Sequence, residues 1–528
     1  MKHHKTYEPG DSAGKLAKSF LRNPLTVVLG VFLMALGYLS LEIMPREENP
    51  QMVVSGSTVI VALPGASAKE VEKIIVKPLE RKLKEVKGVE HIYGVAMDNV
   101  GIVNAAFFIG EKKEDSNLKV YDKIMQNSDM FPKGAQNPII KPLDIDVDIP
   151  ILSIAFYSNG KLSQTELYDK VKQIQHKING LNNVAVTALK GGHKHQFNIE
   201  VDLNKLSGYN LSMGQIMQAV QSIAYNVPAV KNRTKDNKIV MVGVENAIES
   251  AKDIGEIIVA QYMGSPIYLR QVAKIKDSYN IQNFKSALIS TRESNNTFSP
   301  FENQVTLTVS KLQGTNAVNI ADEVKESLET YKETLKKNGI NYVITRNDGE
   351  RADDAVNELV FHLLLSIVII AILLIFVLGW RESLIVTFTV PAILAVTLFV
   401  AYLGGQTINR ITLFAFLLSL GLLVDAAIIV IENIHRHYHS VESAHIEDDE
   451  LMVKATDEIG APTNIATLAI ILTMVPMAFV GGMMGQFMKP IPQNVPVALI
   501  ASLFIAYIFT PYLAVRMLKR PDLSKGEH

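Results

Sequence analysis

Six long apolar runs constrain the fold of this chain more than any other feature of its sequence. The first is Leu25–Met44, and about 20 apolar residues are enough for a helix to cross a hydrocarbon core of ~30 Å. Five further runs follow, at Leu359–Leu378, Ser383–Tyr402, Ile411–Ile431, Pro462–Val480 and Pro492–Met517. The sequence therefore predicts a membrane domain of six helices, with the first at 25–44 and the other five within 356–517.

The residues that flank the runs predict how the chain is oriented. Lysine and arginine are in excess on the cytoplasmic side of membrane proteins, so a basic N-terminal flank favours a cytoplasmic N-terminus. The basic residues are Lys2, Lys5, Lys15, Lys18 and Arg22. No small-residue cleavage site follows the first run, so we expect an uncleaved anchor. Residues 1–24 and 518–528 are then cytoplasmic, and residues 45–355 form a segment on the opposite side of the membrane.

The segment 45–355 repeats one order of secondary structure. Strand-like alternation, an amphipathic helix and a further strand recur in units that begin near Ser57, Pro150 and Gln304. Such units predict α+β sandwiches, in which helices cover one face of a mixed sheet. A glycine pair at 191–192 predicts a hairpin between the strands on either side of it. Residues 194–276 are expected to form an insertion with its own helix.

Composition argues against several classes of function. The net charge of −1 gives no reason to expect a nucleic-acid partner. The chain has no cysteine, which excludes disulfides and thiolate metal sites. The glycine-rich phosphate loop of ATP-binding proteins is missing, so ATP is not the expected energy source. We therefore expect a membrane protein that is not an enzyme and that carries no cofactor.

An aspartate, Asp425, lies near the centre of the fourth apolar run. A carboxylate at that depth costs roughly 3 kcal/mol on insertion scales. Residues of this kind usually face a bundle interior and mark a proton or ion pathway. The other interpretation is a satisfied hydrogen bond between helices. Asp425 is therefore the leading candidate for a residue that carries protons.

Two residues near the end of the same run accompany Asp425. Glu432 follows about two helical turns later, so the two carboxylates fall on one helix face. It is a weaker candidate for the proton relay, and the alternative is a hydrogen-bonded carboxylate at the helix end. Asn433 would support Glu432 in either of these two roles.

Methionine and histidine clusters are weak candidates for metal binding. Thioether sulfur suits soft ions such as Cu(I), but packing by an adaptable apolar side chain is the simpler interpretation. The methionines around the fifth run are Met474, Met477, Met483, Met484 and Met488. Imidazoles also bind metals, although a helix C-terminus attracts cations in any case. The histidines are His435, His437 and His439 after the fourth run, and His193 and His195 in the long segment.

Five motifs in sequence order carry a resemblance to a known family. They are PGASAKEVEKIIVKPLE, LQGTNAVNIADEV, GLLVDAAIIVIEN, PMAFVGGMMGQFMKPIP and TPYLAVRML. Together they resemble the N-terminal half of a resistance–nodulation–division (RND) efflux permease, of the hydrophobe/amphiphile or heavy-metal type. The resemblance covers nearly the whole chain.

The resemblance implies a trimeric pump of the bacterial inner membrane, driven by the proton-motive force. Its first periplasmic porter subdomain would be residues 51–144, and its second would combine 146–188 with 277–346. The insertion at 194–276 would dock toward an outer-membrane channel, and a periplasmic adaptor would complete the assembly. Small molecules or metal ions would leave through the porter.

Two features depart from the family pattern. Many drug-exporting members have two adjacent aspartates in the fourth span, but here Asp425 is followed by Ala426. One carboxylate can still carry a proton, because desolvation favours its protonated form and a nearby cation favours its ionised form. A full permease also has two such halves, related as parallel repeats, and its second half places a lysine near the fourth-span carboxylates.

We find no lysine or arginine in the interior of a predicted run. Asp425 is therefore expected to work only at an interface with another chain. That chain would be a separately encoded second half or a second copy of this one, unless the sequence is a truncated product.

Two other functions compete with efflux. A Sec-type protein-export motor subunit also has six spans, a large loop after the first and an aspartate–alanine pair in the fourth. A non-transporting scaffold or remnant would pack in a membrane complex without exporting anything. The repeated porter-like units and the PGASAKEVE motif favour efflux.

Overall fold

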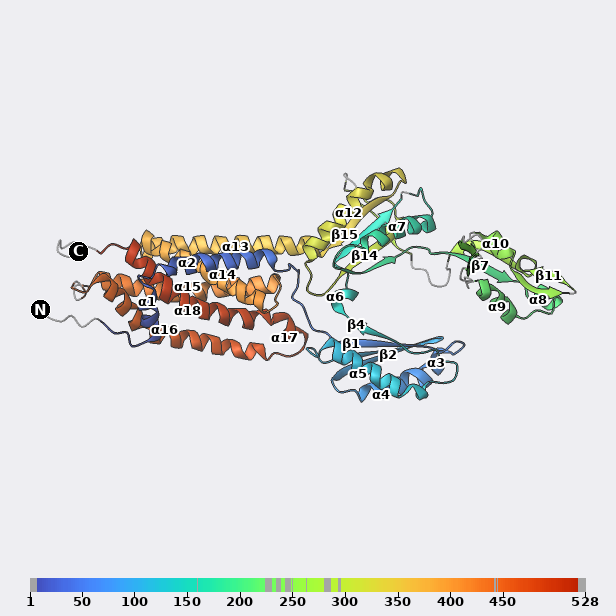
Figure 1. The fold of residues 1–528 in the computed structure, drawn as a ribbon, viewed down its shortest axis with the longest axis horizontal. Helices are drawn as coiled ribbons and strands as arrows, with labels where there is room; N and C mark the ends of the chain where they lie inside the picture. The colour runs from blue at the N-terminus through green and yellow to red at the C-terminus, as the bar shows by residue number, and fades with distance from the viewer. Residues whose placement is uncertain are drawn as a thin grey trace.

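The chain is elongated, with a helical bundle at one end and α+β units at the other (Figure 1). The described chain begins and ends at the bundle end, where Tyr7 contacts α16 (Asp448–Ala478) and Arg520 contacts the segment just before it. The computed structural model describes residues 7–158, 160–223, 230–233, 239–242, 248, 250–262, 264–279, 286–292, 296–440, 443 and 445–520. Parts of the expected cytoplasmic ends and of the insertion at 194–276 fall outside these ranges.

Within the described residues, six helices are long and apolar enough to cross a membrane, which confirms the prediction of six spans. They are α2 (Leu25–Ile43), α13 (Asp348–Val377), α14 (Trp380–Leu403), α15 (Arg410–Tyr438), α16 (Asp448–Ala478) and α18 (Pro490–Met517). A short helix, α17 (Gly482–Met488), precedes the last span. The amphipathic helix α1 (Ser12–Phe20) packs against α16 and α18.

Two membrane helices begin well before their predicted apolar runs. Helix α13 starts at Asp348, where the Asn347 side chain caps it by accepting the Glu350 N–H, and it extends from an α+β unit into the bundle (Figure 1). Helix α16 starts at Asp448, ahead of the run predicted to begin at Pro462. Hydropathy detects only the apolar part of a helix, whereas helical hydrogen bonding continues through polar residues.

The first α+β unit is an antiparallel sheet covered by helices on one face. Its strand order is β2–β3–β1–β4. The strands are β1 (Gly56–Ala62), β2 (Val89–Met97), β3 (Val100–Phe107) and β4 (Ile139–Leu143). The covering helices are α3 (Ala68–Val71), α4 (Lys77–Lys84) and α5 (Lys113–Gln126). A π-helical turn, Glu72–Val76, joins α3 to α4 just before Pro78, which has no N–H to continue the α-helical pattern.

The second α+β unit combines two separate stretches of the chain in one sheet. Strand β14 pairs with both β5 and β6, and β15 pairs with β5. The strands are β5 (Leu152–Tyr157), β6 (Val184–Lys190), β13 (Leu288–Ile289), β14 (Glu302–Lys311) and β15 (Asn341–Asn347). Helices α7 (Gln164–Ile178) and α12 (Ala317–Lys337) bury their apolar faces against it. A short helix, α6 (Ile145–Asp148), precedes this unit.

The hairpin predicted at Gly191–Gly192 is wrong. Strand β6 joins β14, whereas the next strand, β7 (His195–Val201), pairs with β12 (Ala273–Tyr279). The glycine pair separates two units instead of turning one strand back on the other. Beyond it lie β8 (Val230–Arg233), β9 (Ile239–Val242), β10 (Ile258–Tyr262), β11 (Ser265–Tyr268), α8 (Leu203–Gly208), α9 (Met213–Ile223), α10 (Ala251–Gly255) and α11 (Leu269–Val272).

Candidate functional site

Asp425 lies on the outside of this chain's own helical bundle. It is exposed near the middle of α15, while its sequence neighbours Val424 and Ala426 are buried against the other helices. Within the described part of the chain, its carboxylate makes no hydrogen bond and no ion pair. The expectation that such a residue faces a bundle interior is therefore not met by this chain alone.

Five exposed residues of α15 recur in steps of three, four or seven residues. Phe414, Leu418, Gly421, Asp425 and Glu432 are exposed along one side of the helix. Steps of this size place residues on one stripe, as along the seam between two packed helices. We call these five residues the Asp425 face. It carries both candidate carboxylates.

Gly421 leaves room for the backbone of another helix to approach the Asp425 face closely. A Cβ built on Gly421 meets nothing within 4 Å. Small residues let helix backbones approach each other closely in membranes. Gly37 on α2 gives the contrast, because a Cβ there would lie 2.2 Å from the Ala395 Cβ on α14. Gly37 serves packing within the chain, and Gly421 leaves space outside it.

Asn433 does not belong to the Asp425 face. Its side chain is buried and its Nδ2 donates to the Ala455 carbonyl at 2.7 Å and to Glu458 Oε2 at 3.3 Å, so it ties α15 to α16. Glu458 also accepts from Arg436 at 2.9 Å. Asn433 therefore holds α15 against α16 and makes no contact with Asp425.

The histidines make separate polar contacts, and within the described residues they do not gather around one metal-binding point. His435 contacts Glu382 at 3.1 Å, and its ring lies 4.1 Å from that of His439. His437 Nε2 lies 2.7 Å from Glu458 Oε2. In the insertion, His195 pairs with Asp277 at 2.5 Å and His193 stacks on the Tyr279 ring. Among the described residues, no group of three or more histidine, aspartate or glutamate side chains is placed to hold a metal ion.

The methionines have different surroundings. Met477 and Met488 pack against the buried apolar cluster of α14, α15 and α18, which fits the simpler interpretation of adaptable packing. Met483 and Met484 on α17 are exposed, and Met474 is half-buried on α16. A soft-metal role for these five residues stays an untested prediction.

A strap at residues 45–48 joins the bundle to the second α+β unit, and the sequence did not reveal it. Glu47 Oε1 accepts from Lys311 Nζ at 2.8 Å, with the two side chains only 6% and 7% exposed. Arg46 pairs with Asp353 of α13 at 2.8 Å. The Glu47 N–H donates to the Ile408 carbonyl at 3.0 Å, just before α15. The strap thus contacts α13, the start of α15 and β14 together.

The strap also explains an exception to the charge rule. In the orientation that the sequence predicts, Arg410 at the start of α15 lies on the side of the membrane where basic residues are disfavoured. Its guanidinium lies 3.5 Å from Glu48, which also lies 3.7 Å from Arg351 of α13. The charge pattern after the first apolar run was a visible signal, but its partners lie hundreds of residues away in the sequence.

Comparison with known families decides the identity of this arrangement. The model of the AcrB/AcrD/AcrF family matches residues 16–527. The chain belongs to this family. It is an RND-type efflux transporter chain, and the match gives no support to the Sec-type alternative. Together with its six spans, this makes it a multi-pass protein of the inner membrane.

Proposed function

We propose that this chain is one half of a proton-driven RND permease, and that Asp425 takes up and releases the proton at an interface with a second membrane half. The observation that carries the proposal is the exposure of Asp425 midway along a membrane helix without a partner in the described chain. A charge left against lipid at this depth costs roughly 3 kcal/mol or more. A partner that covers the Asp425 face removes that cost.

The shape of the Asp425 face supports packing against another helix. Its residues follow a three- and four-residue repeat, and Gly421 allows a close approach. A cation on the opposing helix would stabilise the ionised form of Asp425, and its withdrawal would favour the protonated form. Alternation between these two states is the elementary step that proton coupling needs.

Glu432 is the proposed second residue of the relay. It is exposed on the same face, two turns nearer the cytoplasmic end of α15. A carboxylate in that position can pass protons between the cytoplasm and Asp425. Asn433 acts only indirectly, through its contacts to α16.

The extramembrane units complete the proposal. The first sheet with α4 and α5 and the second with α7 and α12 serve as periplasmic porter subdomains, through which small molecules or metal ions leave. The insertion between β7 and β12 serves the outer-membrane channel, within a trimeric pump that also contains a periplasmic adaptor. The proton-motive force supplies the energy, and no cofactor takes part.

The direct test is Asp425→Asn in cells that express the complete pump. We expect export of a panel of dyes, antibiotics and metal ions to fall to the level of cells without the permease, because the amide cannot take up a proton. Membrane levels and assembly should stay unchanged. Glu358→Gln, which changes an exposed carboxylate on α13, is the matched control and should export normally. Full export by the Asp425→Asn pump would refute the relay.

A further inference from the structure

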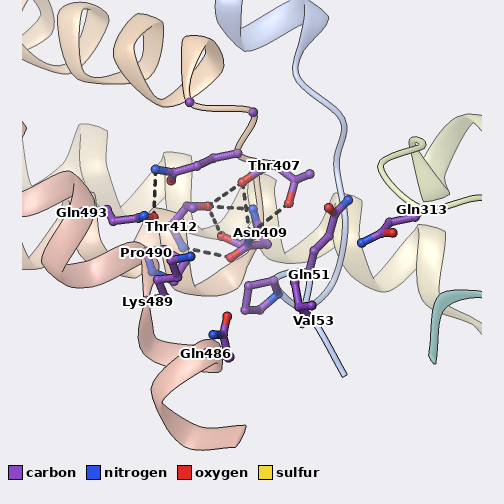
Figure 2. Close-up of a pocket in the computed structure, with 14 residues that line it drawn as sticks. Gln51, Val53, Gln313, Thr407, Asn409, Thr412, Gln486, Lys489, Pro490 and Gln493 are labelled. Atoms are coloured by element: carbon purple, nitrogen blue, oxygen red, sulfur yellow. Dashed lines mark hydrogen bonds between the residues drawn. The ribbon is translucent and has the colours of Figure 1, made fainter. Parts of the chain in front are cut away.

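A polar cavity lies at the outer end of the bundle, between residues 50–53, which follow the strap, and the junction of α17 with α18. Its volume is about 200 Å³. Figure 2 shows Gln486, Lys489 and Gln493 on one side of it and Gln51 and Gln313 on the other. The lining includes five glutamines, two threonines, one asparagine and one lysine, but no carboxylate.

The charge in this cavity is uncompensated. Within the described residues, Lys489 makes no ion pair, and the amide of Gln486 makes no hydrogen bond. Gln493 Oε1 accepts from Gln406 Nε2 at 3.4 Å, and among the described residues the Nε2 group of Gln493 makes no hydrogen bond of its own. Thr407, Asn409 and Thr412 satisfy one another and shape the floor of the cavity (Figure 2). The cavity therefore offers one cation and several amide donors to an anionic group.

An apolar groove continues from the cavity along α14 and α18. Its volume is about 400 Å³, and it is lined by apolar side chains of α2, α14 and α18. On α14 the lining passes from Gly404 in the cavity to Val400 and Val396 in the groove. On α18 it passes from Gln493 to Val497, in the same four-residue step. These steps keep the residues on one helix face, so the cavity and the groove follow one seam.

The dimensions of the groove match one lipid chain. From Val497 to Phe509 the groove follows α18 for about 18 Å by the rise of an α-helix, close to one leaflet of a ~30 Å hydrocarbon core. Ile500 and Phe504 on its rim are about half exposed, so the groove opens sideways to the surrounding membrane. None of its lining residues belongs to α15, so it is separate from the Asp425 face.

We propose that this seam is a binding site for one phospholipid of the outer leaflet with an anionic headgroup. The phosphate-bearing headgroup occupies the polar cavity against Lys489 and the glutamine amides, and one acyl chain lies in the groove between α2, α14 and α18. Within the bilayer, an acyl chain is the apolar group at hand to fill an open groove at this depth. The headgroup supplies selectivity, and the groove fixes the position of the molecule. The site does not depend on the proposed proton relay.

Native mass spectrometry of the purified, assembled permease tests this site, with phosphatidylglycerol and phosphatidylethanolamine as probes. We expect one phosphatidylglycerol per chain to be retained in preference to phosphatidylethanolamine. Lys489→Gln should weaken phosphatidylglycerol binding about fivefold and remove the preference, since one lysine near a membrane surface contributes about that much to anionic lipid binding. Lys519→Gln, at the other end of α18, is the matched control and should keep it.

A second pair of variants tests the groove. Ile500→Trp places a large side chain at the groove and should abolish retention of both lipids, whereas Leu472→Trp on α16 should retain them. Thermal unfolding of each variant checks that the fold is kept. Excess glycerol 3-phosphate should not displace the lipid, because it lacks the acyl chain. Equal binding of the two lipids by the unsubstituted protein, an unchanged preference in Lys489→Gln, retention in Ile500→Trp or displacement by glycerol 3-phosphate would overturn the proposal.

Discussion

At the scale of single residues, Asp425 shows what a sequence can and cannot say about a charge within a membrane span. Its depth in the fourth apolar run was evident from hydropathy alone, and its lack of a nearby cation followed from the sequence. The direction of its side chain did not follow, because that depends on which side of α15 packs against α14, α16 and α18. Only the structure shows Asp425 on the uncovered side.

Tyr7 illustrates a different kind of single-residue contact, between the segment before α1 and helix α16. Its hydroxyl donates to Asp457 Oδ2 at 2.6 Å, and Asp457 also accepts from the backbone N–H groups of Gly10 and Asp11. The hydrogen bond to Asp457, followed by burial, raises the pKa of Tyr7 to about 12. Asp457 thus holds the segment before α1 against α16.

Tyr7→Phe should loosen this N-terminal segment. Loss of a hydrogen bond to a charged group is expected to cost about 1 kcal/mol at this partly exposed site, so amides of residues 7–20 should exchange about fivefold faster. Because the folded-state pKa is raised, the contribution of the contact is complete below pH ~10 and is lost only as the pH rises through about 12. The difference between the two proteins should therefore be constant from pH 6 to about 9. Tyr38→Phe on α2 is the control, and equal exchange in all three proteins would contradict this account.

At the scale of elements, the strap connects the helical bundle to the second α+β unit. It contacts α13, the start of α15 and β14 through Arg46 and Glu47. A displacement of α15 would therefore be transmitted to the second α+β unit through this one short segment. The pair of Glu47 and Lys311 is the more buried of the two ion pairs that Arg46 and Glu47 make.

Glu47→Gln should destabilise the purified protein strongly. It leaves the Lys311 ammonium buried without its counter-ion, and breaking a buried pair from one side costs about 3–5 kcal/mol. The double variant Glu47→Leu with Lys311→Met should recover most of that loss, because it removes both charges. Thermal unfolding measures the series, with Glu329→Gln at the exposed pair with Lys332 as the control. If the double variant is no better than Glu47→Gln, the ion pair is not the cause.

The sequence predicted the elements of this chain unevenly. The six membrane helices and the amphipathic helix of each repeated unit follow from local periodicity. The starts of α13 and α16 were missed because polar residues continue those helices beyond the apolar runs. The pairing of β6 with β14 was missed because it joins strands more than a hundred residues apart, and a local turn signal says nothing about such partners.

At the scale of the whole molecule, some helix surfaces stabilise the chain itself and others are free for assembly with a partner. Gly37 lies in tight contact with Ala395, whereas Gly421 has open space beside it. The same change at the two positions should therefore have opposite consequences for the isolated chain and for the pump.

Gly421→Leu should leave the isolated chain intact and prevent assembly. The leucine meets no atom of its own chain within 4 Å at its Cβ and is the better helix former by up to about 1 kcal/mol. Gly37→Leu should instead push α2 from α14 and unfold the chain at a lower temperature. Size-exclusion chromatography with thermal unfolding distinguishes the two effects. A normal assembly formed by the Gly421→Leu protein would show that the Asp425 face is not an interface.

The cavity and groove on the α14–α18 seam also emerge only at this scale. Their glutamines come from four separate parts of the chain, and none of these positions stands out in the sequence. The exposed carboxylates of the Asp425 face and the lysine of the cavity lie on different surfaces. The chain therefore has one side suited to a protein partner and another suited to lipid.

Photo-crosslinking from the Asp425 face tests the central claim most directly. A photoreactive benzoylphenylalanine replaces Leu418, which lies next to Gly421 on the Asp425 face. It is activated by light in intact membranes that contain the complete pump. The account predicts a covalent adduct with a membrane-spanning protein partner, either a second half or another copy of this chain, identified by mass spectrometry. The same label at Leu373, exposed on α13, is the comparison and should give lipid adducts. Lipid adducts alone at position 418 would contradict the account, because Asp425 would then face the membrane without a partner.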